Sequence, residues 1–390
     1  MKVGLLTLHD SINYGALLQA YALSRVYRML GHDPVLIDRR RDPFGAPLKS
    51  DLSGLNFLRR TAWFLNATGI RREQVRRRRT LAFLRDKIGL TSYHFTDWRD
   101  APSDLGVDLV SVGSDQVWNA SIHDPLDYLP GRIPSGLPVI SYAASIGMPR
   151  LPDTLEEDFR SAVRNFKAVS VREETAVSLL AEMGVSARQV VDPVVLAGRK
   201  VWEELLERQV EPSGRVVFYM LGGDSSPHVE KVVELAERYG VEVDFFVGRM
   251  LLDPLSHRGH PRLFKNLRLW RRFHRSSRVH FHLEDGPASF VRAIAGASAV
   301  VTGSYHALLF AILFGRDVRF IVPGASTPQA AMMVRIRDYA EKIVRGPLLQ
   351  PSVEAAFASV AAGERTKIEV EELERRRQAS LAWLKEAIGC

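Results

Sequence analysis

The sequence predicts an α/β protein of two lobes, each built on a parallel β-sheet, with a cleft between the lobes. Short apolar runs of strand type alternate with amphipathic helical segments along most of the chain, which is the pattern of parallel sheets covered by helices. The 390 residues are enough for two domains, since a domain typically takes about 150 residues. The alternation also starts afresh near residue 215, which indicates a second lobe.

The chain opens with a strand, a polar turn and a helix. Residues 3–8 are an apolar run of strand type. Residues 16–30 carry apolar side chains at helical spacing, and the next strand is expected at residues 34–38. This order places Asn13 and Gly15 beside a helix N-terminus, where backbone N–H groups favour anions.

A basic insertion at about residues 45–100 interrupts the alternation. It interleaves arginines, among them the run 76–79, with aromatic residues such as Trp63 and Phe64. We expect amphipathic helices here, which form either a solvated basic face or a surface for anionic lipid headgroups or a lipid-linked substrate. We expect no nucleic-acid partner, because no recognisable binding module accompanies the arginines.

The alternation then resumes through the rest of the first lobe, which we expect to span residues 1–205. The same pattern builds the second lobe, expected at residues 206–365, after a helix and hinge at residues 202–214. Residues 366–390 are expected to form a charged helix that crosses back to the first lobe. The expected strands are 105–112, 138–141, 168–171, 189–191, 215–221, 241–247, 299–302 and 318–322, and the expected helices are 152–165, 175–183, 226–239, 287–297, 307–314 and 369–388.

Composition limits the class of protein. The chain has 53 Lys and Arg against 45 Asp and Glu, and the net charge of +8 favours an anionic ligand or surface. The single cysteine, Cys390, excludes an intrachain disulfide and a thiolate zinc cluster. The longest apolar run, 307–314, is shorter than the roughly 18–20 residues of a membrane span. With an N-terminus that makes a poor signal peptide, these features predict a cytoplasmic protein.

Polar side chains follow several of the expected strands, where ligands bind in open α/β sheets. His306 lies at the start of an apolar helix and is either an acid, base or phosphate ligand, or a buried histidine that satisfies the strand end. Arg172 presents a fork to a carboxylate or phosphate, or pairs with Glu173 and Glu174. Asp115 is a general base, a partner for sugar hydroxyls, or an N-cap.

Two further patterns carry less information. His280 and His282 alternate on one face of a strand and could hold a metal, but solvated strand histidines are commoner, and we expect no metal site. The pair Gly222-Gly223 is a weak signal for a phosphate loop, because the longer glycine-rich patterns are missing.

Taken in order, the polar strand ends resemble the motifs of the polysaccharide pyruvyl transferase family. The resemblance spans roughly residues 1–322. It is carried by NYGALLQAYAL at 13–23, GSDQVWN at 113–119, SYAASIG at 141–147, SVRE at 170–173, DP at 192–193 and VTGSYH at 301–306.

The resemblance implies a GT-B-like pair of Rossmann-like lobes, with the acceptor on the first lobe and the donor on the second. It implies transfer of a pyruvyl group from phosphoenolpyruvate to hydroxyls of a saccharide as a ketal, in cell-surface or exopolysaccharide biosynthesis. Phosphoenolpyruvate is then a co-substrate, and no cofactor is expected. We expect a lipid-linked acceptor at the inner membrane face. The alternatives are a GT-B glycosyltransferase that uses a nucleotide-sugar, and a scaffold in polysaccharide assembly with altered catalysis.

The same resemblance implies roles for individual residues. His306, as general acid or phosphate ligand, and Asp115 would be catalytic, and Arg172 would clamp the phosphate or carboxylate. The chain departs from many relatives at Ala307, where they have glycine, and at Arg316, where a Lys-Pro pair is common. Besides Arg172, the substrate-binding residues would be Asn13, Tyr14, Gly15, Gln116, Ser304, Tyr305 and Arg316.

Overall fold

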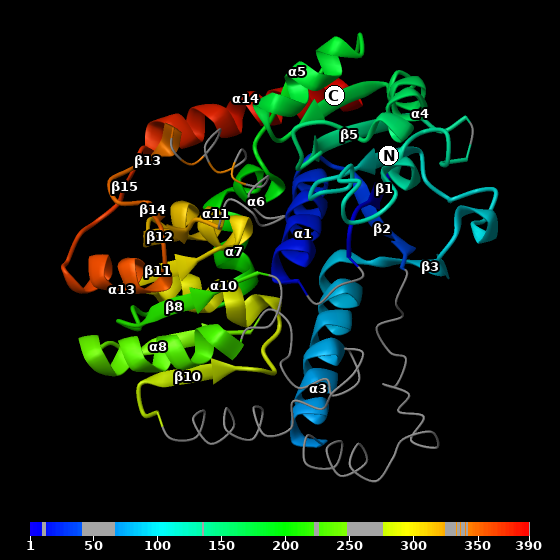
Figure 1. Ribbon diagram of the computed structural model, residues 1–390. Coiled ribbons are helices and arrows are strands. Elements are labelled where there is room, and N and C mark those ends of the chain that lie inside the picture. Colours follow the sequence, from blue (N-terminus) through cyan, green and yellow to red (C-terminus); the bar gives the residue numbers. More distant parts are fainter. Residues whose placement is uncertain are drawn as a thin grey trace.

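The computed structural model has two parallel sheets, of seven and six strands, flanked by helices (Figure 1). It describes residues 1–9, 13–40, 67–134, 136–221, 226–247, 276–323, 333, 336, 340 and 342–389. The expected glycine pair 222–223, residues 41–66 of the insertion (with Trp63 and Phe64), and Cys390 lie outside these residues.

The first lobe holds a seven-stranded sheet in the order β3-β2-β1-β4-β5-β6-β7, with every neighbouring pair parallel. Most consecutive strands are connected by an α-helix, whereas the connections from β3 to β4 and from β4 to β5 contain only short 3-10 turns. Each connection is long enough for the crossover that parallel pairing needs. The strands are β1 (Lys2–Leu6), β2 (Asp33–Arg39), β3 (Leu90–Phe95), β4 (Leu109–Val112), β5 (Val139–Ala144), β6 (Ala168–Val171) and β7 (Arg188–Gln189), and the main helices are α1 (Tyr14–Met29), α4 (Asp153–Val163) and α5 (Glu174–Glu182).

The second lobe holds a six-stranded parallel sheet in the order β10-β9-β8-β11-β12-β14. A short antiparallel pair, β13 (Val344–Arg345) and β15 (Lys367–Ile368), lies outside it. The strands are β8 (Val216–Tyr219), β9 (Val243–Phe246), β10 (Val279–His282), β11 (Ala299–Thr302), β12 (Asp317–Ile321) and β14 (Leu349–Gln350), and the helices are α8 (Ser226–Tyr239), α10 (Pro287–Gly296), α11 (Tyr305–Leu313) and α13 (Val353–Ala361).

Two segments connect the lobes. The first contains α6 (Pro193–Leu196) and α7 (Gly198–Leu206), and the second is α14 (Val370–Ile388), which runs across the top of Figure 1. The backbone N–H of Val191 donates to Ser380 Oγ of α14 at 3.0 Å. The predicted return of the C-terminal helix to the first lobe is therefore confirmed.

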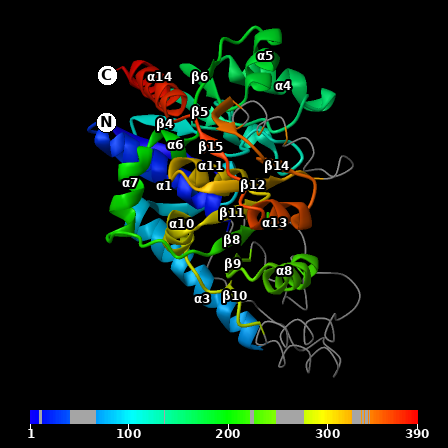
Figure 2. The same cartoon turned by 90° about the vertical axis from the view of Figure 1, so that its left-hand side faces the viewer.

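The two lobes share one apolar core. It contains Leu5 and Ile140 from the first sheet together with Val217 and Val300 from the second. Helices α1 and α11 lie inside this core, and all but a few of their side chains are buried. Figure 2 shows both helices between the two sheets, with α6 and α7 beside them. The inter-lobe region is thus packed by helices that each belong to a different lobe.

The basic insertion differs from its expected form. Helix α3 (Ala67–Phe83) is present, but residues 90–95 form the edge strand β3 rather than a helix. Arg76 is fully buried and donates from Nη1 to the carbonyl of Val247, at the end of β9. Arg79 donates to the carbonyl of Glu284 at 3.0 Å. The expectation of a basic face open to solvent or lipid is therefore wrong for Arg76, which is buried and hydrogen-bonds to the second lobe instead.

No helix among the described residues is both long enough and apolar enough to cross a bilayer.

His282 forms a charged contact at the edge of the second sheet. Its Nε2 lies 3.0 Å from Asp244 Oδ1 and its Nδ1 lies 3.1 Å from Asp285 Oδ2. Its ring stacks on Phe246, with 4.2 Å between ring centroids. Burial opposes the charge, but the bonds to Asp244 and Asp285 outweigh it and raise the pKa of His282 to about 9.

We predict that this contact stabilises the protein below pH about 6.5 and that the stabilisation is lost as pH rises through about 9. The raised pKa of His282 corresponds to a loss on the order of 3 kcal/mol in the free energy of unfolding. Urea unfolding of wild type and His282→Gln at pH 6 and pH 9.5 measures it, and the variant should lose less stability over this interval. His280→Gln, on the same strand, is the control. Equal losses in wild type and His282→Gln would contradict the prediction.

Candidate active site

The N-termini of α1 and α11 meet between the lobes. Gly15, in the first turn of α1, lies against the ring of His306, in the first turn of α11. A Cβ atom on Gly15 would lie 2.2 Å from His306 Nδ1, so only glycine fits without displacing the histidine. The carboxyl ends of strands from both sheets surround this contact, as expected for ligand sites in open α/β sheets.

Asp192 joins the groups around this contact. It follows β7, it is fully buried, and its Oδ1 caps α6 by accepting from Val194 N at 2.9 Å. Its Oδ2 accepts from Arg172 Nη1 at 2.8 Å and from Ser114 Oγ at 3.3 Å. His306 Nε2 lies 3.5 Å from the same Oδ2. Burial alone would raise the pKa of Asp192, but His306 and Arg172 outweigh it and hold the pKa below its usual range.

Arg172 follows β6 and is 3 % exposed. Its guanidinium carbon lies 4.5 Å from the centre of the Tyr305 ring, a cation–π contact. Burial opposes its charge, but Tyr305 and Asp192 lead a set of groups that raise its pKa above the usual range. Its Nε and Nη2 are buried and have no hydrogen-bond partner among the described residues. One edge of the guanidinium, with Glu173 Oε2 at 4.0 Å from its Nε, therefore makes no hydrogen bond among the described residues, and an arginine can hold an anion through two such N–H groups.

His306 is 3 % exposed and lies next to Tyr305, which it contacts edge-on at 5.6 Å between ring centroids. At 3.5 Å from Asp192, its Nε2 is within ion-pair distance but has no hydrogen bond in the described part of the chain. Ser304 caps the helix by accepting from Ala307 N at 3.4 Å. The imidazole is held by packing, and its Nε2 faces the Asp192 carboxylate, an arrangement in which a histidine can transfer a proton.

Asp115 and Glu173 add two more carboxylates. Asp115 is 7 % exposed, has a φ of 65°, and accepts at Oδ1 from Gln116 N at 2.9 Å. It also helps to raise the pKa of Arg172, so its charge acts on that guanidinium. Glu173 Oε1 accepts from Ser145 Oγ at 2.7 Å and from Gly147 N at 2.9 Å. The side chains that surround Arg172 are therefore mainly acidic.

Several sequence predictions meet in this cluster. The structure brings His306, Arg172, Tyr305, Gly15 and Asp115 together. The alternative that Arg172 pairs mainly with the following glutamates is wrong: its Nε is 4.0 Å from Glu173 Oε2, whereas Asp192 is 2.8 Å from Nη1.

Other predicted site residues make hydrogen bonds within the protein. Asn13 caps α1 by accepting from Gly15 N at 3.0 Å, as Ser304 caps α11. Gln116 accepts at Oε1 from Asn119 Nδ2 at 2.6 Å and lies against Gly147.

Tyr14 joins the two lobes. Its ring stacks on Phe290, with 4.7 Å between centroids, and meets Phe246 edge-on at 6.0 Å. Its hydroxyl donates to the carbonyl of Asp285 at 2.9 Å, and the residue is 1 % exposed. The expectation that Tyr14 binds substrate therefore does not fit, because its side chain is enclosed by the second lobe.

The structure does not bring Arg316 to the cluster. It lies beyond the C-terminal end of α11, whereas His306 is in the first turn. The nine residues of α11 separate them by about 13 Å. A substrate-binding role beside His306 is therefore wrong for Arg316.

Sequence reasoning missed Asp192 as a site residue and missed the network behind it. Gln19 Nε2 donates to Thr7 Oγ1 at 2.9 Å, and Thr7 Oγ1 donates to the carbonyl of Ser114 at 2.9 Å. The available signal was the pair Asp192-Pro193 after a strand, which also reads as an ordinary N-cap and first helical residue. Among the described residues, no group of three His, Cys, Asp or Glu side chains could hold a metal ion.

Comparisons with known proteins agree with this architecture. The family model described as polysaccharide pyruvyl transferase matches residues 13–323. UDP-GlcNAc 2-epimerase from Neisseria meningitidis, solved bound to UDP-GlcNAc, aligns at 10% identity and a TM-score of 0.53, over 100% of this chain and 99% of that one. UDP-N-acetylglucosamine 2-epimerase from Rickettsia bellii aligns at 10% identity and 0.51, over 99% and 95%. These are GT-B proteins, so the predicted fold is confirmed. A search of curated proteins finds no match.

We predict that Gly15→Ala destabilises the protein by about 1–3 kcal/mol, because its methyl group would overlap the His306 ring. Urea unfolding measures the loss. Gly131→Ala is the control, since no atom lies within 4 Å of its added Cβ and its φ is not in the left-handed region. If the two substitutions have equal effects, the close contact is not a constraint.

We predict two effects of Asp192→Asn. At pH 7 it weakens a buried ion pair, and losing one partner of such a pair costs about 3–5 kcal/mol. Because the pKa of Asp192 is depressed in the folded state, its contribution is present above pH about 3.8 and is lost as pH falls through the folded value. The variant should therefore lose less stability than wild type between pH 5 and pH 2. Urea unfolding measures both effects. Asp158→Asn, on an exposed helix face, should change neither the stability at pH 7 nor the loss of stability between pH 5 and pH 2.

Proposed function

The chain belongs to the polysaccharide pyruvyl transferase family, and from this premise we propose that it transfers a pyruvyl group from phosphoenolpyruvate to two hydroxyls of a saccharide. The product is a cyclic ketal, and the reaction serves cell-surface or exopolysaccharide biosynthesis. Because it belongs to this family, the protein is a transferase. The identities of its donor and its acceptor are what we propose.

The observation that supports the donor most directly is the free edge of Arg172. Two buried N–H groups without partners cost free energy in the empty protein. A carboxylate or phosphate would satisfy both at once. Tyr305 fixes the guanidinium plane from one face, so the fork is already oriented before an anion arrives.

The surrounding carboxylates restrict how the donor binds. Asp192, Glu173 and Asp115 all act on Arg172, so the donor anion meets one arginine among three acidic side chains. His306 is the proposed proton donor beside this anion.

The steps follow from these positions. His306 gives its proton to the methylene carbon, which becomes the methyl group of the product and leaves a cation at the adjacent carbon. The first sugar hydroxyl attacks that carbon and passes its proton to Asp115. The C–O bond to phosphate breaks, and phosphate leaves with the electron pair and with the proton from Asp115. The second hydroxyl closes the ketal, and its proton returns to His306.

Asp192 acts as a positioning residue in this scheme. It contacts both Arg172 and His306 through one oxygen, so the anion-binding fork and the proton donor share a common support.

We also propose that the acceptor is lipid-linked and is presented at the inner membrane face. The support is the interleaving of arginine and aromatic residues in the insertion. Arg78 is exposed on α3 and can belong to such a surface, whereas Arg76 is buried and cannot.

The test is thermal stability of the purified protein with phosphoenolpyruvate or UDP-GlcNAc. At about 100 times its dissociation constant, a ligand adds about 2.7 kcal/mol of stability. We expect phosphoenolpyruvate to raise the melting temperature of wild type. The rise should be lost in Arg172→Lys, which keeps the charge but not the fork, and kept in Arg316→Lys.

A melting shift with UDP-GlcNAc alone would favour the nucleotide-sugar glycosyltransferase and would contradict pyruvyl transfer. A shift with phosphoenolpyruvate that survives Arg172→Lys would place the donor elsewhere. With a shift established, release of inorganic phosphate in the presence of saccharide acceptors measures turnover, and His306→Gln should abolish it.

A further inference from the structure

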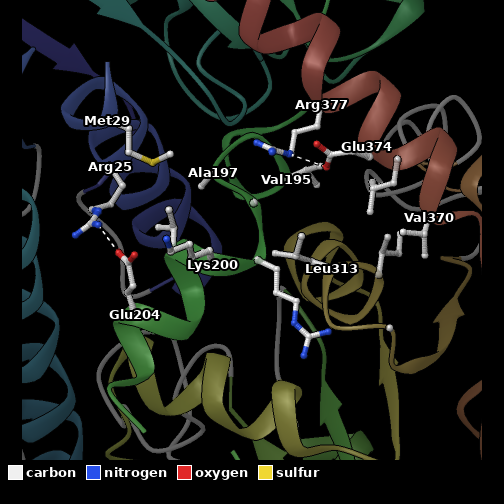
Figure 3. A pocket seen from close by; sticks show the side chains of 16 residues that line it. Arg25, Met29, Val195, Ala197, Lys200, Glu204, Leu313, Val370, Glu374 and Arg377 are labelled. Carbon is white, nitrogen blue, oxygen red and sulfur yellow. Dashed lines mark hydrogen bonds and ion pairs between the residues drawn. The ribbon is translucent and has the colours of Figure 1, made fainter. Parts of the chain in front are cut away.

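A second pocket lies at the far ends of the two helices that meet in the active site. Its volume is about 570 Å³, which is within the usual range for small-molecule sites. Helix α1 contributes Arg25 and Met29 from its C-terminal half, and α11 contributes Leu313 from its last turn. Figure 3 shows Met29 turned toward the segment around Ala197 and Arg25 turned toward Glu204. At 16 residues, α1 is about 24 Å long, so this pocket is separate from the cluster around His306.

The walls of this second pocket are mostly apolar, and so is its rim. Val195, Ala197 and Leu313 line the interior. Met29 and Val370 are 62 % and 66 % exposed, and they are two of the four large hydrophobic side chains exposed in the described part of the chain. Both side chains add to the apolar surface that a ligand in the pocket would cover.

The charges around the pocket are mainly positive. Arg25 pairs with Glu204 at 2.6 Å and Arg377 pairs with Glu374 at 2.9 Å, so the two carboxylates of the lining are already used (Figure 3). Lys200, which also lines the pocket, has no hydrogen bond or ion pair with any described residue.

A further cation lies behind the pocket. Arg316 follows Gly315 of the lining, and its Nε is buried without a hydrogen-bond partner among the described residues. Burial and the nearby charge of Arg199 lower the pKa of Arg316. Arg199 pairs with Glu203 at 2.8 Å, so of these two cations it is Arg316 that keeps a buried N–H without a hydrogen-bond partner among the described residues.

We propose that the second pocket binds an amphipathic organic anion, whose apolar body fills the space beside Leu313 and whose acidic head pairs with Lys200. A purely apolar ligand would leave Lys200 unpaired, and a small inorganic anion would leave the apolar walls and rim in water. The proposal does not rest on pyruvyl transfer, because it concerns a separate site.

A ligand in this position contacts both connections between the lobes. Lys200 belongs to α7, on the first connection, and Val370 and Arg377 belong to α14, on the second. The same ligand would also touch the ends of α1 and α11 opposite to Gly15 and His306. Binding would therefore stabilise the arrangement of the lobes around the active site.

Isothermal titration of the full-length protein tests the proposal, with decanoate below its micelle concentration as the probe. Decanol has the apolar body without the charge, and acetate has the charge without the body. We expect decanoate to bind at least tenfold more tightly than either. Equal binding of decanoate and decanol would overturn the acidic-head assignment, and absence of decanoate binding would overturn the proposal.

Two variants locate the site. Lys200→Met keeps most of the side-chain length and should weaken decanoate binding about fivefold to tenfold, as expected for loss of about 1 kcal/mol of charge pairing. Leu313→Glu places a carboxylate on the apolar wall and should abolish binding. Lys167→Met, at an exposed lysine of the first lobe, is the matched control and should bind as wild type does. If Lys200→Met and Lys167→Met bind decanoate equally, the probe is bound elsewhere.

The titration is independent of the donor test. Arg172→Lys should keep decanoate binding even though it loses the response to phosphoenolpyruvate. If the pyruvyl transferase proposal fails, decanoate binding is still expected. If decanoate does not bind, the response to phosphoenolpyruvate is still expected.

Discussion

The buried carboxylate of Asp192 is the interaction on which the arrangement of the active site depends. One of its oxygens caps α6 at the first inter-lobe connection, and the other contacts Arg172, Ser114 and His306. A lone carboxylate in this position would be costly, since nothing but protein surrounds it. Its partners remove that cost only when β6, the segment after β4 and α11 are all in place. The geometry around His306 is therefore tied to the docking of the two lobes.

Strand ends and helix order were predictable from the sequence because each rests on local pattern. The turns after β4, β5, β6 and β11 were located correctly, and so the cluster around His306 could be anticipated. Side-chain direction was not, because it depends on contacts across the lobes. Tyr14 lies between Asn13 and Gly15 in a motif, yet its ring points into the second lobe. Asp192 reads as an ordinary helix cap, and only the folded chain shows that its second oxygen serves Arg172.

The basic insertion shows the limit of composition as a guide. A run of arginines indicates a charged surface, but it does not tell which guanidinium is enclosed. Arg76 is buried against the end of β9, whereas Arg78, two residues on, is exposed. Arg316 illustrates a related error: proximity to a motif in sequence suggested a shared site, although a helix of nine residues lies between them.

The apolar core shared by the lobes has a consequence for how such proteins can diversify. Leu5 and Val300 belong to one continuous apolar cluster, so each lobe buries part of its apolar surface only against the other lobe. Exchange of a whole lobe between two relatives would join halves whose inner faces were never fitted to each other, and the hybrid would carry voids and clashes along α1 and α11. Changes in the loops at the strand ends, by contrast, would leave the core along α1 and α11 intact.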